Sequence, residues 1–507
     1  MKFLSNLKRM LVASVVGLAF FSCAVDSDDG RSEKKESFVF DSRVKGLDVI
    51  FGTSKLGETK LTVKRSEWNT LLSNYDLNSK NEDCVHADYS FKKGDYSWDI
   101  KDVGFRIRGN TSRCRPQIDK KTYQQAHFKI DFEEWPVIID GVETEREEKM
   151  GGVMKGVILK RCKDDHTYTR EVFCYNYFRQ CGVWTSPRAG YTRLLIDIVE
   201  EDGSVEKVDF GVYEMIENID KQFLKARTAE EKGGDFNGNK GNLWKCTWKS
   251  EKGPKFTTDY SESDFGVEDI PLTGPASEYS YDLKTNKDKL SKAKTEITDF
   301  ITSLNELSDS DPDAIKTWYE SKMDMDLFIK TYAINVILGM WDDYWYNSNN
   351  FYFYFDKEGK AYFIPYDYDN SLGTNMGFIA ATRDPLNWGE LDDGSKPLIQ
   401  KMFKVPEYVN LYKKYLLQYS GSESGFDFAK ASKTLTGYQN LIQNYIAADK
   451  CSRCKLSWND TTPKFVDEAA SWSNPKGSDL LFSGDEEANY FKARQKTIND
   501  YVSYDSE

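Results

Sequence analysis

The sequence predicts an α+β protein in which a mixed sheet region precedes a helical region. Short segments that alternate apolar and polar residues recur over residues 97–245, and this period of two is typical of half-buried strands. Residues 326–340 repeat apolar side chains every three to four positions, which is typical of an amphipathic helix. Helical spacing returns at residues 397–419, 426–448 and 486–502. We therefore expect a mixed sheet lobe, a helical lobe and a helical C-terminal extension over residues 421–507.

Length and composition narrow the function classes. The 507 residues are enough for two or three domains or one large elaborated domain, and 14% of them are aromatic. The formal net charge of -13 argues against nucleic-acid and anionic-lipid partners, because neutralising phosphates needs clustered Lys and Arg. Only three histidines are present, which leaves little material for catalysis or metal binding by His.

The N-terminus resembles a bacterial lipoprotein signal peptide. Lys2, Lys8 and Arg9 precede an apolar run over residues 10–21, and Cys23 follows. The run is too short to span a bilayer. The resemblance implies a signal peptide over residues 1–22 and a lipid on Cys23, and the acidic residues 24–30 resemble the export tag of Bacteroidota surface lipoproteins. We expect a tether over residues 23–37 and a location at the outer membrane or cell surface; the alternative is an ordinary signal peptide.

Nine cysteines bear on the redox compartment. Setting Cys23 aside leaves eight, an even number that permits disulfides in an exported chain without fixing their pairing. Cys451 and Cys454 form a lone CxxC with no histidine nearby. A local disulfide or two inert thiols is therefore a better interpretation than zinc.

Alternating apolar and polar residues in the first part of the chain predict strands on both sides of a turn. Residues 38–95 form a strand-rich segment, with short alternating pieces at residues 47–51 and 60–64. Strands at residues 97–108 lead into a turn formed by Gly109, Asn110, Thr111 and Ser112, and Lys129 lies in the strand over residues 126–132. A strand, a turn with glycine and a strand with a central lysine suit phosphate binding, although a plain turn is the more common reason for such a glycine.

The middle of the chain adds a helix and a hairpin. Lys160 ends a predicted strand, and a helix begins at Thr169 and ends before Gly182. Glu171 lies in the first turn of this helix. It can be a functional acid, or simply a first-turn acid that interacts with the helix dipole. Strands follow at residues 191–198, at residues 207–216, which include Glu214, and at residues 241–245. The polar residues 250–287 are expected to form a long surface excursion.

Two polar clusters flank a predicted β-hairpin. Its arms are residues 351–355 and 361–366. Before it come Asp342, Asp343, Asn347, Asn349 and Asn350, and after it come Asp367, Asp369 and Asn370. Because a hairpin returns the chain beside its start, we expect both clusters at one end of it.

The clusters carry ligands that suit a divalent metal. Gathered carboxylates repel one another and lose solvation, so a cation is expected to compensate them. Oxygen ligands without His favour Mg²⁺, Mn²⁺ or Ca²⁺ over zinc. An EF-hand is excluded because Leu372 stands where its glycine is required. The remaining alternative is an acidic surface turn.

In order along the chain, these motifs resemble the CotH (spore-coat protein H) kinase family. The matching residues are Arg108 to Ser112, Phe128 to Ile130, Leu159 and Lys160, Asp164 and Asp165, Arg170, Gly211 to Glu214, Glu217, Gly241 to Lys245, and above all residues 341–373, which contain DDYWYNSNN and PYDYDNSLG. The resemblance implies an atypical protein-kinase-like fold over residues 96–420. It also implies transfer of phosphate from ATP, with a divalent metal, to a protein or small-molecule acceptor.

The resemblance implies these roles for the site residues. Asp342, or alternatively Asp343, orients or deprotonates the acceptor hydroxyl. Asp367 holds the metal, assisted by Asp369 and by Asn347 or Asn350. Lys129 or Lys160 contacts the phosphates of ATP, Glu171 or Glu214 pairs with that lysine, and the turn Gly109, Asn110, Thr111 and Ser112 covers the phosphates. One departure from the family pattern is Gln124 and Gln125, which occupy the place of a basic pair.

Two other functions fit the same residues. A non-catalytic surface lipoprotein would use the acidic cleft to bind Ca²⁺ and a glycan or a peptide. Glycoside hydrolysis by two opposed carboxylates is also compatible with the residue types. The dense set of acids and amides at a helix end favours the kinase, whereas the scarcity of ATP outside the cytoplasm favours the non-catalytic lipoprotein.

Overall fold

The computed structural model describes residues 45–446, 481 and 489–503. Within these ranges it leaves out residues 111, 121, 147–148, 164, 166, 229–233, 235, 250–252, 375, 377–378 and 390–394. Cys23, the expected signal peptide and tether, Cys451 and Cys454 lie outside the described residues. The described part of the chain belongs to one compact unit. The expected boundaries at residues 95 and 420 stay a prediction.

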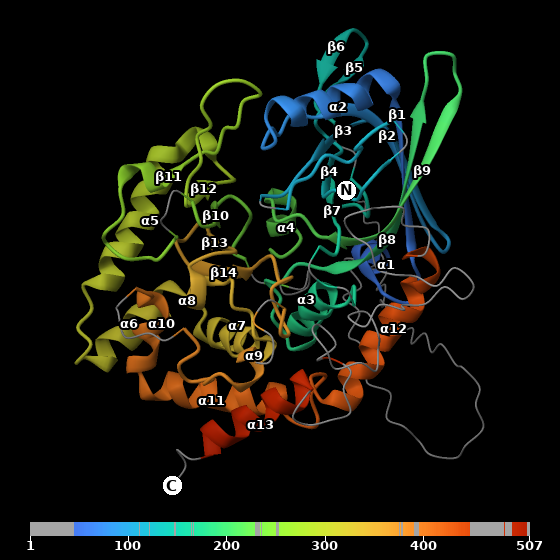
Figure 1. Cartoon of the computed structure of the whole chain (residues 1–507). Coiled ribbons are helices and arrows are strands. Elements are labelled where there is room, and N and C mark those ends of the chain that lie inside the picture. Colours follow the sequence, from blue (N-terminus) through green and yellow to red (C-terminus); the bar gives the residue numbers. More distant parts are fainter. Residues whose placement is uncertain are drawn as a thin grey trace, which may run out of the picture. The chain divides into compact units, whose positions relative to one another are not determined.

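Seven strands close into a barrel in the N-terminal part of this unit (Figure 1). They are β1 (Gly57–Lys64), β2 (Val85–Lys93), β3 (Tyr96–Ile107), β4 (Phe128–Asp131), β7 (Gly156–Lys160), β8 (Ala189–Val199) and β9 (Val205–Ile216). The order is β1-β2-β3-β4-β7-β9-β8, and β1 pairs with β8 in parallel whereas the other pairs are antiparallel. The sheet is therefore mixed, as expected. Alternate residues such as Phe105, Phe128 and Leu159 fill the interior.

The expectation of a strand at residues 47–51 is wrong, because this segment is the helix α1 (Lys45–Phe51). Leu47, Ile50 and Phe51 are buried together, and their spacing of three and four places them on one helix face. Five residues are too few for alternation to distinguish a strand from a helix. The ammonium group of Lys93 donates a hydrogen bond of 2.7 Å to the carbonyl oxygen of Ile50, which satisfies the end of the helix.

Further elements border the barrel. They are α2 (Arg65–Leu77), the hairpin β5 (Val137–Ile139) with β6 (Val142–Thr144), α3 (Arg170–Gln180) and α4 (Lys221–Lys225). The helix expected from Thr169 is confirmed as α3. Gly182 follows it with a φ of 83°, and the amide of Val183 donates to the carbonyl oxygen of Phe178 at 2.9 Å. This is the glycine termination that the sequence predicts.

A second sheet of five strands has the order β11-β12-β10-β13-β14. The strands are β10 (Asn242–Cys246), β11 (Phe265–Gly266), β12 (Tyr281–Leu283), β13 (Phe351–Phe355) and β14 (Ala361–Pro365). The predicted hairpin is confirmed as β13 and β14, which pair antiparallel. The expectation that residues 250–287 are only a surface excursion is wrong, since β12 is buried and pairs with β10. Three residues are too short a strand to recognise among polar neighbours.

The C-terminal part is helical, as expected. Its helices are α5 (Leu290–Asn305), α6 (Pro312–Lys322), α7 (Met325–Leu338), α8 (Tyr344–Asn347), α9 (Ile379–Thr382), α10 (Pro397–Gln400), α11 (Pro406–Ser420), α12 (Phe428–Ile446) and α13 (Tyr490–Ser503), with 3₁₀ turns η2 (Glu262–Asp264), η3 (Lys287–Lys289) and η4 (Met402–Lys404). The helix α13 docks on the end of α7, where the Arg494 Nε donates to the carbonyl oxygen of Val336 at 3.0 Å. Among the described residues, no helix is both long and apolar enough to cross a membrane.

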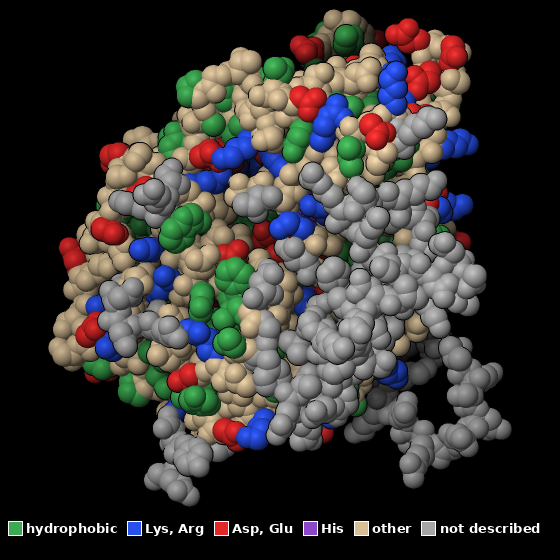
Figure 2. Space-filling view, in the orientation of Figure 1, with side chains coloured by type: hydrophobic (Ala, Val, Ile, Leu, Met, Phe, Trp, Pro, Cys, Tyr) green, Lys and Arg blue, Asp and Glu red, His purple; other side chains and the backbone are tan. Residues whose placement is uncertain are grey.

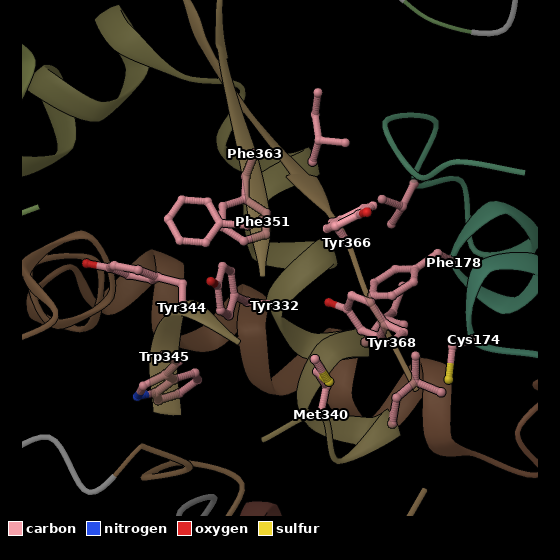
Figure 3. Close-up of a cluster of buried hydrophobic side chains, with 14 of the residues drawn as sticks. Cys174, Phe178, Tyr332, Met340, Tyr344, Trp345, Phe351, Phe363, Tyr366 and Tyr368 are labelled. Carbon is pink, nitrogen blue, oxygen red and sulfur yellow. The ribbon is translucent and has the colours of Figure 1, made fainter. Parts of the chain in front are cut away.

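An aromatic core supports the hairpin and the loops around it (Figure 3). Phe351 of β13 stacks on Phe363 of β14 with ring centroids 5.0 Å apart, and Tyr332 of α7 packs edge-on against Phe363 at 5.2 Å. Phe178 of α3 meets Tyr368 at 4.9 Å. These contacts fix the second sheet against α3 and α7, which hold the polar clusters.

Candidate functional site

One edge of the five-stranded sheet brings both polar clusters together. Cys246 of β10 pairs with Phe351 of β13, and Phe351 pairs with Pro365 of β14. The three residues therefore form one row across the sheet. The chain continues from this row into residues 247–248, back into residues 349–350 and on into residues 366–367, so these three segments leave the sheet at the same edge.

Three asparagines hold the carboxylate of Asp342. The side-chain amide of Asn347 donates to Oδ1 at 2.6 Å, and that of Asn349 donates to the same oxygen at 3.0 Å. Asn350 donates to Oδ2 at 3.0 Å and to the main-chain oxygen of Asp342 at 3.1 Å. Hydrogen bonds from several donors fix the direction of a carboxylate without neutralising it. The carboxylate of Asp342 is thus held in one orientation.

Asp343 has a different environment from that of Asp342. It is buried and caps α8, accepting a hydrogen bond from the amide of Tyr346 at 2.8 Å. Asn335 of α7 donates to its other oxygen at 2.6 Å, and the Tyr368 hydroxyl donates to Asn335 at 2.6 Å. Burial raises the pKa of Asp343 to about 7, and its hydrogen-bond donors oppose the rise. The structure places Asp343 where it shapes the loop that carries Asp342.

Asp367 begins the loop that follows β14. Its amide donates a hydrogen bond of 2.8 Å to the hydroxyl of Tyr175 on α3. Farther along this loop, the amide of Leu372 donates to the carbonyl oxygen of Leu338 at 2.7 Å, and the Arg170 Nε donates to the carbonyl oxygen of Leu372 at 3.3 Å. The loop is therefore fixed between α3 and α7.

Four non-glycine residues around the site have left-handed backbones. Ser348 has a φ of 52°, Asn350 of 53°, Asp367 of 62° and Leu372 of 50°. Such conformations cost free energy and persist only where the surrounding structure enforces them. All four lie in the two loops of the site, where these backbone conformations fix the positions of the side chains.

Lys160 is the basic residue at the centre of the site. Its ammonium nitrogen lies 2.5 Å from a carboxylate oxygen of Glu171 and 3.5 Å from one of Asp369, and it forms a closer ion pair with Asp367. Burial disfavours the charge on Lys160, but these acids outweigh it and hold the pKa well above its usual value. Burial likewise disfavours the charge on Asp367, whose pKa is nevertheless held below its usual value by Lys160 and Arg108.

Two buried glutamates flank this lysine. Glu214 of β9 is the register partner of Lys160, so both side chains lie on the same face of the barrel. Burial raises the pKa of Glu214 well above its usual value, and the neighbouring Glu171 raises it further. Burial also raises the pKa of Glu171, although Lys160 opposes this rise. Of the two glutamates, Glu171 is the one that forms an ion pair with Lys160.

The N-terminus of α3 is fixed by Asp165. Its carboxylate accepts hydrogen bonds of 2.8 Å from the amides of Thr169 and Arg170 and pairs with the Arg170 guanidinium at 2.6 Å. Burial acts to raise the pKa of Asp165, but Arg170 and the hydrogen-bond donors hold it below its usual value. Because Glu171 is the next residue, this cap sets its position beside Lys160.

Lys129 lies apart from this cluster of charges. Its register partner on β7 is Ile158, two residues before Lys160, so the side chains of Lys129 and Lys160 lie on the same barrel face. The ammonium group of Lys129 lies 3.3 Å from Asp131.

The predicted turn follows β3. Gly109 has a φ of 111°, and a Cβ there would lie 2.7 Å from the Ser112 hydroxyl, so glycine is required for this turn. Asn110 closes the turn by accepting a hydrogen bond from the amide of Arg113 at 3.3 Å, and Thr111 is outside the described residues.

Sequence reasoning assigned no role to Arg108 or His127. The Arg108 guanidinium donates a hydrogen bond of 2.6 Å to the Tyr366 hydroxyl, directly before Asp367. Burial opposes its charge, while Tyr366 and Asp367 favour it, and the net effect raises the pKa of Arg108. His127 is buried, and its Nδ1 accepts a hydrogen bond from the Arg161 amide at 3.1 Å. Burial and the nearby Lys160 lower its pKa well below the usual value, so it is neutral. The feature of the sequence that could have pointed to Arg108 was its position at the end of a predicted strand, immediately before the turn.

The donor atoms fit a hard divalent cation. Glu171, Asp367 and Asp369 each offer a carboxylate oxygen, and these oxygens lie within 4.8 Å of one another. A set of carboxylate oxygens suits Mg²⁺ or Mn²⁺ and also Ca²⁺. The Oδ1 of Asn349 accepts a hydrogen bond from the Trp248 amide at 2.8 Å.

A barrel with a buried Lys–Glu pair, placed against oriented acids on a helical lobe, defines an atypical kinase-like protein. Comparison with protein families then identifies the family. The family described as CotH kinase protein matches residues 105–475, and the chain belongs to this family. The resemblance drawn from the sequence motifs is thus confirmed. Comparison with curated proteins finds no match for the chain.

Proposed function

We propose that this protein transfers the γ-phosphate of ATP to a hydroxyl group of a protein or small-molecule acceptor with a divalent metal. One observation carries the proposal. Lys160 contacts Glu171, Asp367 and Asp369, and the sheet edge that carries Asp367 also carries the asparagines that hold Asp342. Phosphoryl transfer needs a cation for the phosphates, acids for a metal and an oriented base, and these are the parts present.

The side chains have distinct tasks in this reaction. Lys160 and Arg108 bind phosphate oxygens, and the turn of Gly109, Asn110 and Ser112 covers them. Asp342 accepts the proton of the acceptor hydroxyl as its oxygen attacks the γ-phosphorus, and the bond to the leaving ADP oxygen breaks. Asp343 acts through position, because it caps the helix that follows Asp342.

Asp367 and Asp369 would hold the metal, together with either Asn347 or Asn350. The chemistry that bound Mg²⁺ or Mn²⁺ supplies there is neutralisation of phosphate charge. Glu171 is engaged by Lys160 and keeps this ammonium group in place, as the Lys–Glu pair of protein kinases does.

We also propose that the protein is exported and anchored by a lipid on Cys23, at the outer membrane or cell surface. The positively charged start, the short apolar run and the cysteine that follows it support this. Labelling cells with a radioactive fatty acid tests it, since Cys23→Ser should abolish incorporation into the protein.

Calorimetric titration tests the binding of ATP and metal that the proposed activity requires. ATP titrated with Mg²⁺ into the full chain should bind, and Asp367→Ala should weaken that binding by roughly tenfold or more. Asp309→Ala is the matched control, because Asp309 pairs with Lys401 on the surface. An Asp367→Ala protein that binds ATP as tightly as the wild type would overturn the site assignment. Binding of Ca²⁺ with no binding of ATP would favour the non-catalytic surface lipoprotein.

A further inference from the structure

The segment after β10 touches the residues that hold Asp342. The amide of Trp248 donates to the Oδ1 of Asn349 at 2.8 Å, and Asn349 in turn donates to Asp342 at 3.0 Å. The side chain of Trp248 is nevertheless 40% exposed. The main chain of Trp248 is therefore one hydrogen-bonded residue away from the carboxylate of Asp342, and its exposed indole ring is open to a ligand at the surface.

Close packing keeps Trp248 in this position. A Cβ on Gly253 would lie 2.7 Å from Cε3 of the Trp248 ring and 2.5 Å from the Cβ of Ser348. The Gly253 backbone therefore fits between the ring and the loop that leads to Asn349. Since no larger residue fits there, the ring is held by the same loop that orients Asp342.

Two further aromatic side chains, one directly before Asp342 and one four residues after it, are partly exposed. Trp341 and Tyr346 pack edge-to-face with centroids 6.5 Å apart, and the guanidinium of Arg383 lies 4.7 Å from the Tyr346 ring centre. The Trp341 Nε1 donates to the carbonyl oxygen of Thr374 at 3.1 Å, which fixes its ring. In Figure 2, hydrophobic side chains gather on the face that carries β14 and α8. We call Trp248, Trp341 and Tyr346 the aromatic rim.

We propose that the aromatic rim is the acceptor subsite and that the acceptor is a carbohydrate. This rests on the proposed kinase function and names its substrate class. The faces of aromatic rings carry partial negative charge and attract polarised C–H bonds, which line the faces of a sugar ring. A sugar also presents many hydroxyl groups at its edge, so stacking on Trp248 brings a hydroxyl towards Asp342. Rings that are already fixed lose little entropy on binding.

The reaction balances without a further reactant. A sugar hydroxyl oxygen forms a bond to the γ-phosphorus of ATP, and the bond between that phosphorus and the β,γ-bridging oxygen breaks. The electron pair of the broken bond stays on ADP, and the hydroxyl proton passes to the carboxylate of Asp342. The products are a sugar phosphate ester and ADP.

Binding without nucleotide tests the substrate class. Cellotetraose, chitotetraose and an uncharged serine-containing hexapeptide are titrated separately into the full chain, with tryptophan fluorescence and calorimetry as readouts. At least one of the two sugars should bind, and Trp248→Ala should weaken its binding by roughly tenfold or more. Trp248→Phe, which keeps an aromatic face, should stay within about threefold of the wild type. The matched control is Tyr501→Ala, since Tyr501 is 43% exposed on the C-terminal helix.

The outcomes separate this inference from the kinase proposal. Sugar binding that depends on an aromatic residue at position 248 supports the inference. The inference is overturned if neither sugar binds, if Trp248→Ala binds sugar as well as the wild type, or if only the peptide binds. Titration of Mg²⁺ and ATP into the same proteins should give the same affinity for Trp248→Ala and the wild type. Failure of the wild type to bind ATP would instead count against the kinase.

Discussion

The ammonium nitrogen of Lys160 lies 2.5 Å from the carboxylate of Glu171, although one residue ends a barrel strand and the other opens a helix. Both side chains are buried, and Asp367 and Asp369 share the same lysine. One ammonium group therefore contacts three acids. This relationship makes Lys160 the residue whose loss should have the largest effect.

Lys160→Met should abolish ATP binding and destabilise the fold. The change removes the ammonium group that contacts Glu171, Asp367 and Asp369, and breaking a buried ion pair costs about 3–5 kcal/mol. We expect a loss of this size in the free energy of unfolding, measured with urea, and no calorimetric signal with Mg²⁺ and ATP. Lys129→Met is the control, because Lys129 lies on the same barrel face but pairs with Asp131, outside the cluster around Lys160. Equal effects of the two substitutions would contradict the assignment of Lys160.

Asp343→Asn should change how stability depends on pH. The pKa of Asp343 is about 7 in the folded protein against an ordinary value of 3.8. Between these two values the unfolded chain has lost the proton and the folded protein keeps it, so the free energy of unfolding falls as pH rises, and it levels off above about pH 7. The asparagine variant lacks this contribution, so its curve should fall by a few kcal/mol less across the window. Urea unfolding from pH 4.5 to 8 checks this, and parallel curves would refute it.

Asn349→Ala should lower the rate without lowering ATP affinity. The substitution removes one donor to Asp342 and the acceptor for the Trp248 amide. A misdirected base should reduce kcat by roughly tenfold, while the Kd for Mg²⁺ and ATP stays unchanged. Asn176→Ala, which removes a hydrogen bond to Tyr438, is the matched control. If ATP affinity fell and kcat did not, Asn349 would belong to the nucleotide site.

Asp369→Asn should weaken metal binding. Asp369 shares a carboxylate cluster with Glu171 and Asp367, and the substitution removes one negative charge from it. We expect the Kd for Mn²⁺ to rise by roughly tenfold or more, as measured by electron paramagnetic resonance of the free ion. Asp309→Asn should leave the Kd unchanged. A chelator should stop phosphate transfer by the wild type, and transfer that persists would refute a metal requirement.

Local patterns predicted the elements that carry the site. The hairpin of β13 and β14, the helix α7 and the helix α3 appear where their periodicity placed them. The hairpin alone was enough to predict that Asn350 and Asp367 leave at one end. Which of Lys129 and Lys160 meets Asp367 was not decided by sequence, because both lie on the same face of adjacent strands and the choice depends on where β14 packs.

Long-range pairing accounts for what the sequence did not reveal. The barrel closes through a parallel pair of β1 and β8, which are separated by more than a hundred residues, and no local pattern specifies this partner. The strand β12 depends in the same way on β10 for its pairing. The hydrogen bond from Arg108 to Tyr366 joins the barrel to the second sheet, so its role emerges only from the assembled fold.

The left-handed backbones at Ser348, Asn350, Asp367 and Leu372 imply an unusual response to engineering. Glycine adopts this conformation without a steric penalty, so glycine at any of these positions would relax the folded backbone by about 1 kcal/mol. It would also increase the conformational entropy of the unfolded chain, and it would remove a side chain that forms part of the site or packs beside it. A search for thermostable variants should therefore find these loops resistant to improvement.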